Sequence, residues 1–199
     1  MSVSAAHEIK ALCLREPSLT LAVAESMTGG RMQAALTAVS GASGYFLGGL
    51  TAYSLDQKVR QLGVARAAAA KVNCVSAEVA VQMARGAVAL FGADMAVATT
   101  GYAELAPEHH VDAPFAWWAI AQRVTPRRWR IATGRVVCPG MNRTQAQAAV
   151  TDAVVAELAT FLISHHATAV APAAISAPAG PGLVSGRSGK RKSNRPQSS

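Results

Sequence analysis

The sequence predicts a three-layer α/β/α sandwich on a mixed sheet, and three features support this prediction. Short apolar runs of strand length alternate with segments of helical periodicity along most of the chain. Two strand-like segments, 115–121 and 129–137, flank a turn around Thr125-Pro126 and predict an antiparallel hairpin. A chain of 199 residues with 51% hydrophobic residues can bury the core of one domain but is short for two.

The first third of the chain predicts helices and strands in alternation. The second strand contains the pair Gly48-Gly49, which indicates a bend or a close approach of backbone. The helix that follows this strand stops at Gly63, a residue type favoured just after a helix end. In order, the predicted elements are a helix at 7–15, a strand at 19–24, a helix at 28–39, a strand at 46–53 and a helix at 55–62.

The remaining elements carry clearer helix signals. Ser76 is placed to cap a helix, Glu78 complements the dipole of its first turn, and Gly92 ends it. Asn142 and Gln145 resemble a capping box at the start of the last helix. In order, the predicted elements are a helix at 75–91, strands at 95–99, 115–121 and 129–137, and a last helix with the apolar stripe Val150, Val154, Leu158 and Leu162.

Composition divides the chain at residue 166. From His166 onward Ala, Pro, Gly and Ser dominate and hydrophobic periodicity stops, which predicts a folded domain at 1–165 and a disordered basic tail at 166–199. The tail contains five basic residues and no acid, so it carries most of the formal charge of +8. Nucleic-acid binding by the folded part is therefore not expected, and only weak contact through the tail is.

Cysteine usage and hydropathy predict a soluble cytoplasmic protein with no membrane partner. Cys13, Cys74 and Cys138 lie far apart without metal-ligand spacing, so we expect reduced thiols and no metal site. Residues 1–17 lack the apolar core of a secretory signal, and no run approaches the roughly 18 consecutive apolar residues of a spanning helix. The sequence leaves self-association open.

Hydroxyls and glycines gather directly after the first predicted strand. The residues there are Ser26, Thr28, Gly29 and Gly30, at the start of a predicted helix. Free backbone N–H groups and hydroxyls at such a position suit a phosphate or a carboxylate. The alternative is an ordinary strand-to-helix turn with a hydroxyl cap. Glu25 would either face a cation or ribose hydroxyls, or orient the neighbouring backbone.

A second group consists of Ser43, Tyr53 and Lys58. Serine is a poor nucleophile until a base removes its proton, and a lysine can do so when burial lowers its pKa. Ser–Lys arrangements are a known variant of the serine triad, and the Tyr53 hydroxyl could relay the proton or hold the lysine. An ordinary turn serine and a solvated surface lysine are the alternatives.

In combination these motifs resemble the C-terminal domain of the CinA proteins, the family that includes the bacterial nicotinamide-nucleotide amidohydrolases. The resemblance covers residues 5–163. The matching elements are E-S-x-T-G-G at Glu25, Y-S-x-x-x-K at Tyr53, V-S-x-E-V-A at Val75, the pair Thr100-Gly101, and an arginine at the start of the last helix, Arg143. The segment Ser40-Gly41-Ala42-Ser43 resembles the family's P-G-x-S, with serine in place of the proline.

The resemblance implies a three-layer α/β/α fold and hydrolysis of the carboxamide of nicotinamide mononucleotide. The products would be nicotinic acid mononucleotide and ammonia, and no metal or other cofactor would be needed. It also implies Ser43 as the nucleophile, Lys58 as its base and Tyr53 as an assisting group. The nucleotide-binding residues expected from the motifs are Ser26, Thr28, Gly29, Gly30, Thr100 and Arg143.

The chain departs from the family directly after Thr100-Gly101. Family members have a glycine-rich loop there, whereas this chain has Glu104 and Leu105, which add bulk and negative charge. A phosphate lying against this loop would be repelled. We also expect a divergent, stand-alone branch of the family, without the N-terminal domain of full-length CinA proteins. The alternative prediction is therefore a catalytically silent protein of this type that binds a nucleotide or a protein partner.

Overall fold

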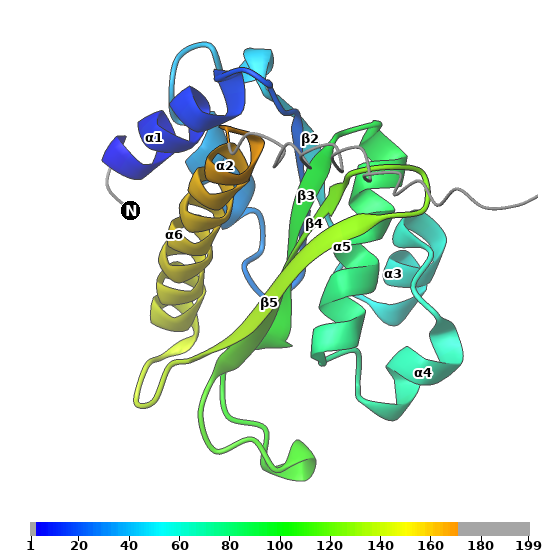
Figure 1. Cartoon of the computed structure of the whole chain (residues 1–199). Coiled ribbons are helices and arrows are strands. Elements are labelled where there is room, and N and C mark those ends of the chain that lie inside the picture. Colours follow the sequence, from blue (N-terminus) through cyan, green and yellow to red (C-terminus); the bar gives the residue numbers. More distant parts are fainter. Residues whose placement is uncertain (1–2, 171–199) are drawn as a thin grey trace, which may run out of the picture.

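A mixed five-stranded sheet in the order β2-β1-β3-β4-β5 forms the centre of the computed structural model, which describes residues 3–170 (Figure 1). β1 pairs in parallel with β2 and with β3, whereas β3, β4 and β5 pair antiparallel. The carboxyl ends of β1, β2 and β3 therefore lie at one edge of the sheet, which we call the carboxyl edge. The strands are β1 (Leu21–Glu25), β2 (Phe46–Thr51), β3 (Met95–Tyr102), β4 (Phe115–Arg123) and β5 (Trp129–Val137).

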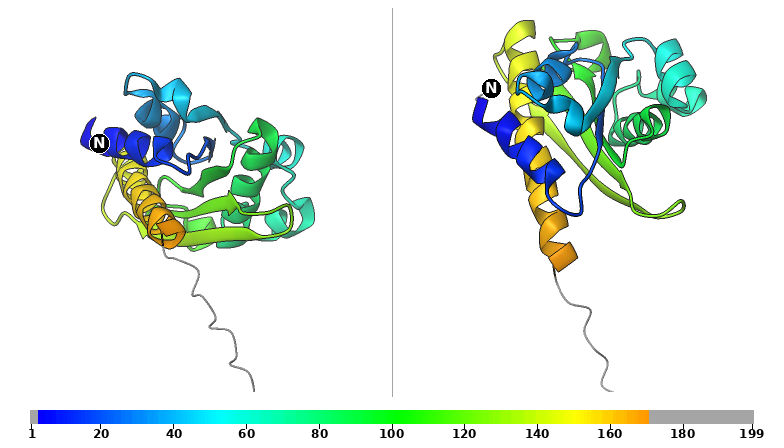
Figure 2. Two further views of the ribbon diagram at one scale, coloured as in Figure 1. Left: turned by 45° about the horizontal axis from the view of Figure 1, so that its top comes forward. Right: turned by 90° about the horizontal axis from the view of Figure 1, so that it is seen from above.

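Helices cover both faces of the sheet and confirm the predicted three-layer class. In Figure 1, α1, α2 and α6 lie on one side of the sheet and α3, α4 and α5 on the other. Both views of Figure 2 show α1 beside α6. The helices are α1 (Val3–Leu14), α2 (Arg31–Thr37), α3 (Leu55–Leu62), α4 (Arg66–Lys71), α5 (Ala77–Phe91) and α6 (Arg143–Val170), and short 3₁₀ turns lie at Ala42–Gly44 and Pro107–His109.

The two faces of the sheet bury different side chains because successive residues of a strand point to opposite sides. Larger residues such as Val23, Val97 and Ile120 face α1, α2 and α6. The opposite face is lined by alanines, which leave room for α5 to pack against the sheet. These alanines are Ala22, Ala24, Ala96, Ala98, Ala119 and Ala121.

Local signals in the sequence place several element ends correctly. The Ser76 hydroxyl accepts the backbone N–H of Val79 at 3.2 Å and caps α5. Asn142 and Gln145 exchange two side-chain to backbone hydrogen bonds of 3.0 Å each, which confirms the capping box.

In β2, a Cβ on Gly48 would lie 2.7 Å from the Phe91 ring, so the predicted close approach exists. The helix α4 had no counterpart in the sequence prediction.

The last helix is longer than the sequence indicates. α6 continues to Val170, so a tail that starts at residue 166 is wrong for residues 166–170. The side chain of His166 is buried, and its Nε2 lies 2.8 Å from the carbonyl oxygen of Leu12 in α1. This contact between α6 and α1 extends the folded domain beyond the predicted boundary at 165. The predicted disorder of 171–199 concerns residues outside the described range.

Within the described residues, Arg143–Thr168 of α6 has the length and mean hydropathy, 1.5, of a membrane-crossing helix. Half of the most apolar stretch is buried inside the protein. The predicted inner stripe from Val150 to Leu162 is fully buried in the core. The apolar character of α6 is thus that of a core helix in an α/β fold of the soluble type, and a cytoplasmic location stays a prediction.

Candidate active site

The carboxyl edge of the sheet collects residues from distant parts of the chain. Ser26 directly follows β1, Tyr53 follows β2, and Thr100 lies near the end of β3. A cavity of about 280 Å³ lies between these segments and α3, and Lys58 and Tyr102 also line it. Crevices outside the carboxyl ends of parallel strands are the usual place for ligands in open α/β sheets. The edge is therefore the candidate active site.

Lys58 is the buried cation of this site. Its side chain is only 1% exposed, and its Nζ lies 2.9 Å from the Ser26 Oγ. The same Nζ donates to the carbonyl oxygens of Ala52 at 2.7 Å and Tyr53 at 3.2 Å. Burial lowers the pKa of Lys58, and the nearby Cys74 thiol group opposes that shift in part. The described residues provide no carboxylate within ion-pair distance of this amine.

These three contacts fit a neutral amine as well as an ammonium. An ammonium would donate one hydrogen to each of the three oxygens. A neutral amine would keep its two hydrogens for Ala52 and Tyr53, and its lone pair would accept the hydroxyl hydrogen of Ser26. Because burial favours the neutral form, the second arrangement gives a serine with a base already in hydrogen-bond reach.

Ser43 lies at the opposite edge of the sheet from Lys58. It sits in the 3₁₀ turn Ala42–Gly44 directly before β2, whereas Lys58 follows the same strand. A strand of the length of β2, Phe46–Thr51, spans about 20 Å at 3.3 Å per residue, so the two side chains cannot meet. The pairing of Ser43 with Lys58 is therefore wrong, and Ser26 takes the place beside the lysine.

Glu25 occupies the position where an anionic ligand was expected. Its buried carboxylate accepts the backbone N–H of Gly30 at 2.9 Å and that of Gln33 at 3.0 Å. The N–H of Gly29 donates to the carbonyl oxygen of Ser26 at 3.2 Å. The protein itself satisfies the N–H donors of Gly29 and Gly30, so these two groups are not free for the predicted anionic ligand. Of the three roles considered for Glu25, orientation of the neighbouring backbone is the one observed.

The two predicted threonines have structural contacts. Thr28 is fully buried, and its Oγ1 lies 2.7 Å from the Oγ1 of Thr99 in β3. This hydrogen bond ties the turn after β1 to β3, and the Thr28 side chain does not line the cavity. Thr100 lines the cavity and donates its hydroxyl hydrogen to the carbonyl oxygen of Cys74 at 2.7 Å. This bond holds Asn73 and Cys74, which both have positive φ, at the wall of the cavity.

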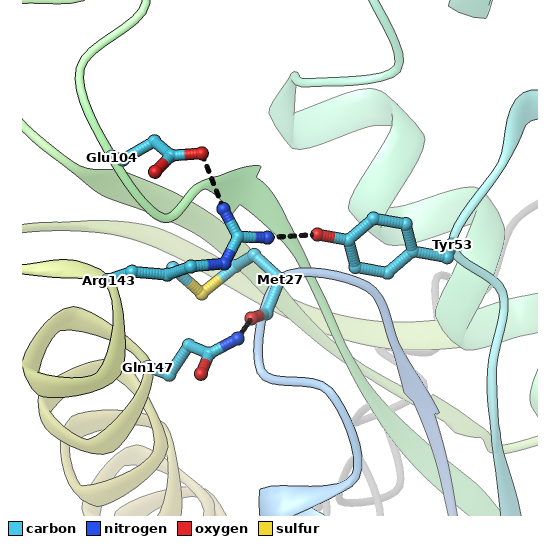
Figure 3. Close-up of polar contacts among 5 residues, drawn as sticks. All are labelled: Met27, Tyr53, Glu104, Arg143 and Gln147. Carbon is cyan, nitrogen blue, oxygen red and sulfur yellow. Dashed lines mark hydrogen bonds and ion pairs between the residues drawn. The ribbon is translucent and has the colours of Figure 1, made fainter.

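Arg143 joins the rim of the cavity to the loop after β3 (Figure 3). Its guanidinium donates to the Tyr53 hydroxyl at 2.5 Å and to the Glu104 carboxylate at 2.6 Å. One turn further along α6, Gln147 donates to the carbonyl oxygen of Met27 at 2.9 Å. The Tyr53 hydroxyl thus contacts Arg143 and not the lysine, which corrects the predicted proton relay.

Several residues of the site escaped the sequence prediction. Gln147 and Tyr102 carry no local signal, because their roles depend on which segments pack together. The sequence did contain a signal for the Ser26–Lys58 pair. Each of these residues follows one of two consecutive strands, and neighbouring parallel strands end at the same edge of the sheet. Among residues 3–170 no group of three or more His, Cys, Asp or Glu side chains is arranged to hold a metal ion.

The fold and this edge define an α/β protein with a buried Ser–Lys pair at the carboxyl ends of its parallel strands. The sequence model of the CinA C-terminal domain matches residues 3–162. The chain belongs to the CinA C-terminal domain family.

Relatives agree with this assignment. A CinA-like protein of Citrifermentans bemidjiense is 52% identical over 93 residues, which make up 47% of this chain and 22% of that protein. The chain therefore spans about a fifth of the length of the curated relatives it matches. A CinA superfamily protein of Klebsiella pneumoniae has a solved structure that is 27% identical, with a TM-score of 0.72 over 81% of this chain and 97% of that one. A competence damage-inducible protein of the same species is 29% identical, with a TM-score of 0.71 over 80% and 96% of the two chains.

Proposed function

We propose that this protein is an amidohydrolase of the nicotinamide-nucleotide type, which converts a carboxamide into a carboxylate and ammonia. Ser26 is the nucleophile and Lys58 is its general base. The observation that carries the proposal is the 2.9 Å contact between the Ser26 hydroxyl and a buried lysine amine at the wall of a cavity. A hydroxyl and an amine in this relation form a nucleophile with its activating base.

In the first half of the reaction, Ser26 forms a bond to the carboxamide carbon. Its hydroxyl proton passes to the neutral Lys58 amine, and the Ser26 Oγ attacks to give a tetrahedral intermediate. When the C–N bond breaks, the Lys58 ammonium returns that proton to the leaving nitrogen, and ammonia departs. The product of this half is an ester between Ser26 and the acyl group.

In the second half, water replaces ammonia. Lys58 takes a proton from the water as its oxygen attacks the ester carbon, and the same proton then returns to the Ser26 oxygen as the ester bond breaks. The carboxylic acid leaves, and the site regains its starting state. Positioned general bases contribute about 10²–10⁴-fold to such reactions, which sets the scale expected of Lys58.

The walls of the cavity suit a flat ring that carries a carboxamide. Leu55, Val75 and Tyr102 supply apolar and aromatic surface, and the Ser26–Lys58 pair supplies polar groups on one side. Apolar walls with a few fixed polar groups are typical of small-molecule sites. Together with membership of the CinA C-terminal domain family, this supports a pyridine carboxamide as the substrate class.

The test is release of ammonia from nicotinamide mononucleotide by the purified protein. We expect Ser26→Ala to abolish the release, because the alanine has no oxygen to attack with. Ser43→Ala is the matched control, since it removes an exposed serine at the far edge of the sheet, and it should leave the rate unchanged.

Turnover that survives in Ser26→Ala would refute the nucleophile. A second outcome separates the two functions predicted from the sequence. If nicotinamide mononucleotide raises the melting temperature of the wild-type protein but no ammonia appears, the protein is a catalytically silent binder.

A further inference from the structure

Glu104 changes the charge at the rim of the cavity. Its carboxylate lies 2.6 Å from the Arg143 guanidinium, and the second arm of that guanidinium is held by the Tyr53 hydroxyl (Figure 3). Tyr53 lines the cavity, so Arg143 stands directly at its rim. Both terminal nitrogens of Arg143 thus already have an oxygen partner.

An unpaired arginine at this rim would attract a phosphate. The planar guanidinium binds phosphate or carboxylate oxygens in pairs, which makes it the usual partner of such groups. With Glu104 in contact, the local charge of the pair is near zero. Lys58 does not compensate, because it is buried in the cavity wall and burial favours its neutral form.

A phosphate that approached Arg143 would meet two obstacles. It would have to displace the Glu104 carboxylate from the guanidinium, and it would then lie beside a group of like charge. A neutral hydroxyl meets neither obstacle, because it can donate a hydrogen bond to Glu104 and accept one from Tyr53.

We infer that Glu104 is a specificity-determining residue that favours a carboxamide substrate without a phosphate over a phosphorylated one. This inference rests on the proposed amidohydrolase function and concerns which form of the substrate the site accepts. Nicotinamide riboside and its 5′-phosphate, nicotinamide mononucleotide, represent the two classes, since they differ only in the phosphate. The riboside, which lacks the phosphate, is the preferred form.

The effect is moderate, because the pair is exposed. The side chains of Arg143 and Glu104 retain 43% and 65% of their accessible surface. Exposed charges interact weakly through solvent, so we expect a preference on the order of tenfold rather than complete exclusion. The preference should shrink as salt concentration rises, because salt screens exposed charges.

The experiment compares both compounds in the wild-type protein and in Glu104→Gln. The variant keeps the size of the side chain and removes its charge. We expect the ratio of kcat/KM for the phosphate form to that for the riboside to rise about tenfold, mainly through a lower KM for the phosphate form. Glu108→Gln is the matched control, because Glu108 lies four residues along the same exposed loop and forms no ion pair among the described residues.

Binding measured by calorimetry in the Ser26→Ala background separates this inference from the proposed reaction. If neither the wild-type protein nor Glu104→Gln with Ser26 intact turns over either compound, the reaction is wrong, yet a tenfold tighter binding of the phosphate form in Glu104→Gln would still support the role of Glu104. The inference is overturned if Glu104→Gln leaves the affinity ratio within twofold of the wild-type ratio. It is also overturned if Glu108→Gln produces the same gain, because a general loss of negative charge would then explain the result.

Discussion

Replacing Lys58 with methionine tests the proposed chemistry most directly. Methionine has an unbranched apolar side chain of similar length, so it can fill the space of the lysine stem while removing the amine. The change deletes the contact with the Ser26 hydroxyl and the hydrogen bonds to the carbonyls of Ala52 and Tyr53. We expect amide hydrolysis to fall by about 10²–10⁴-fold, the range of a positioned general base.

The same change should lower the stability of the protein without unfolding it. Each lost hydrogen bond contributes about 0.5–1.5 kcal/mol net, and an unpaired buried carbonyl costs about 1–3 kcal/mol. Burial disfavours the charged form of the Lys58 amine and lowers its pKa, so removal of the amine offsets part of that loss. Two carbonyls lose their donor, so urea unfolding should give a net loss below the sum of their two penalties, about 2–6 kcal/mol.

The pH dependence of stability and of activity provides a second test of Lys58. Because the pKa of Lys58 is lowered in the folded protein, the unfolded chain binds more protons between the folded and unfolded pKa values. The free energy of unfolding should therefore gain a contribution from Lys58 as pH rises through that window, and this contribution should be missing in Lys58→Met. Activity of the wild-type protein should rise in the same direction, since the neutral amine is the base.

The assay is ammonia release across a pH series, with Lys71→Met as the control because Lys71 is an exposed lysine at the end of α4. Activity of Lys58→Met within tenfold of the wild type, in protein that unfolds with the same cooperativity, would refute the assignment of Lys58 as the base. A wild-type rate that falls as pH rises above neutrality would contradict the requirement for a neutral amine.

Two further substitutions test the framework of the site. Glu25→Gln should lower the free energy of unfolding by about 1–3 kcal/mol in urea titrations and should reduce activity. The reason is that one amide oxygen cannot satisfy the donors of Gly30 and Gln33, which both carboxylate oxygens now accept. A variant with full stability would show that this carboxylate is not needed to hold the turn. Gly86→Ala places a Cβ 2.1 Å from the backbone oxygen of Leu62 and therefore forces α5 and α3 apart. This should cost about 1–3 kcal/mol of stability and lower the melting temperature. An unchanged melting temperature would contradict the close packing of these helices.

Local patterns in the sequence were reliable where neighbouring residues decide the structure. The capping residue Ser76, the capping box at Asn142, and the alternation of strands and helices all depend on contacts a few residues apart along the chain. The end of α6 was misplaced because the contact between His166 and Leu12 joins the two ends of the domain. Composition alone could not show that α1 provides a partner there.

The sequence by itself determined the fold class, the family resemblance and the candidate site residues, among them Ser26, Ser43 and Lys58. Only the tertiary structure decided which of them meet. Ser26 and Lys58 are 32 residues apart and lie within 2.9 Å, whereas Ser43, closer to the lysine in sequence, lies at the other edge of the sheet. Strand direction is the physical reason, because a side chain before a strand and one after it are separated by the length of that strand.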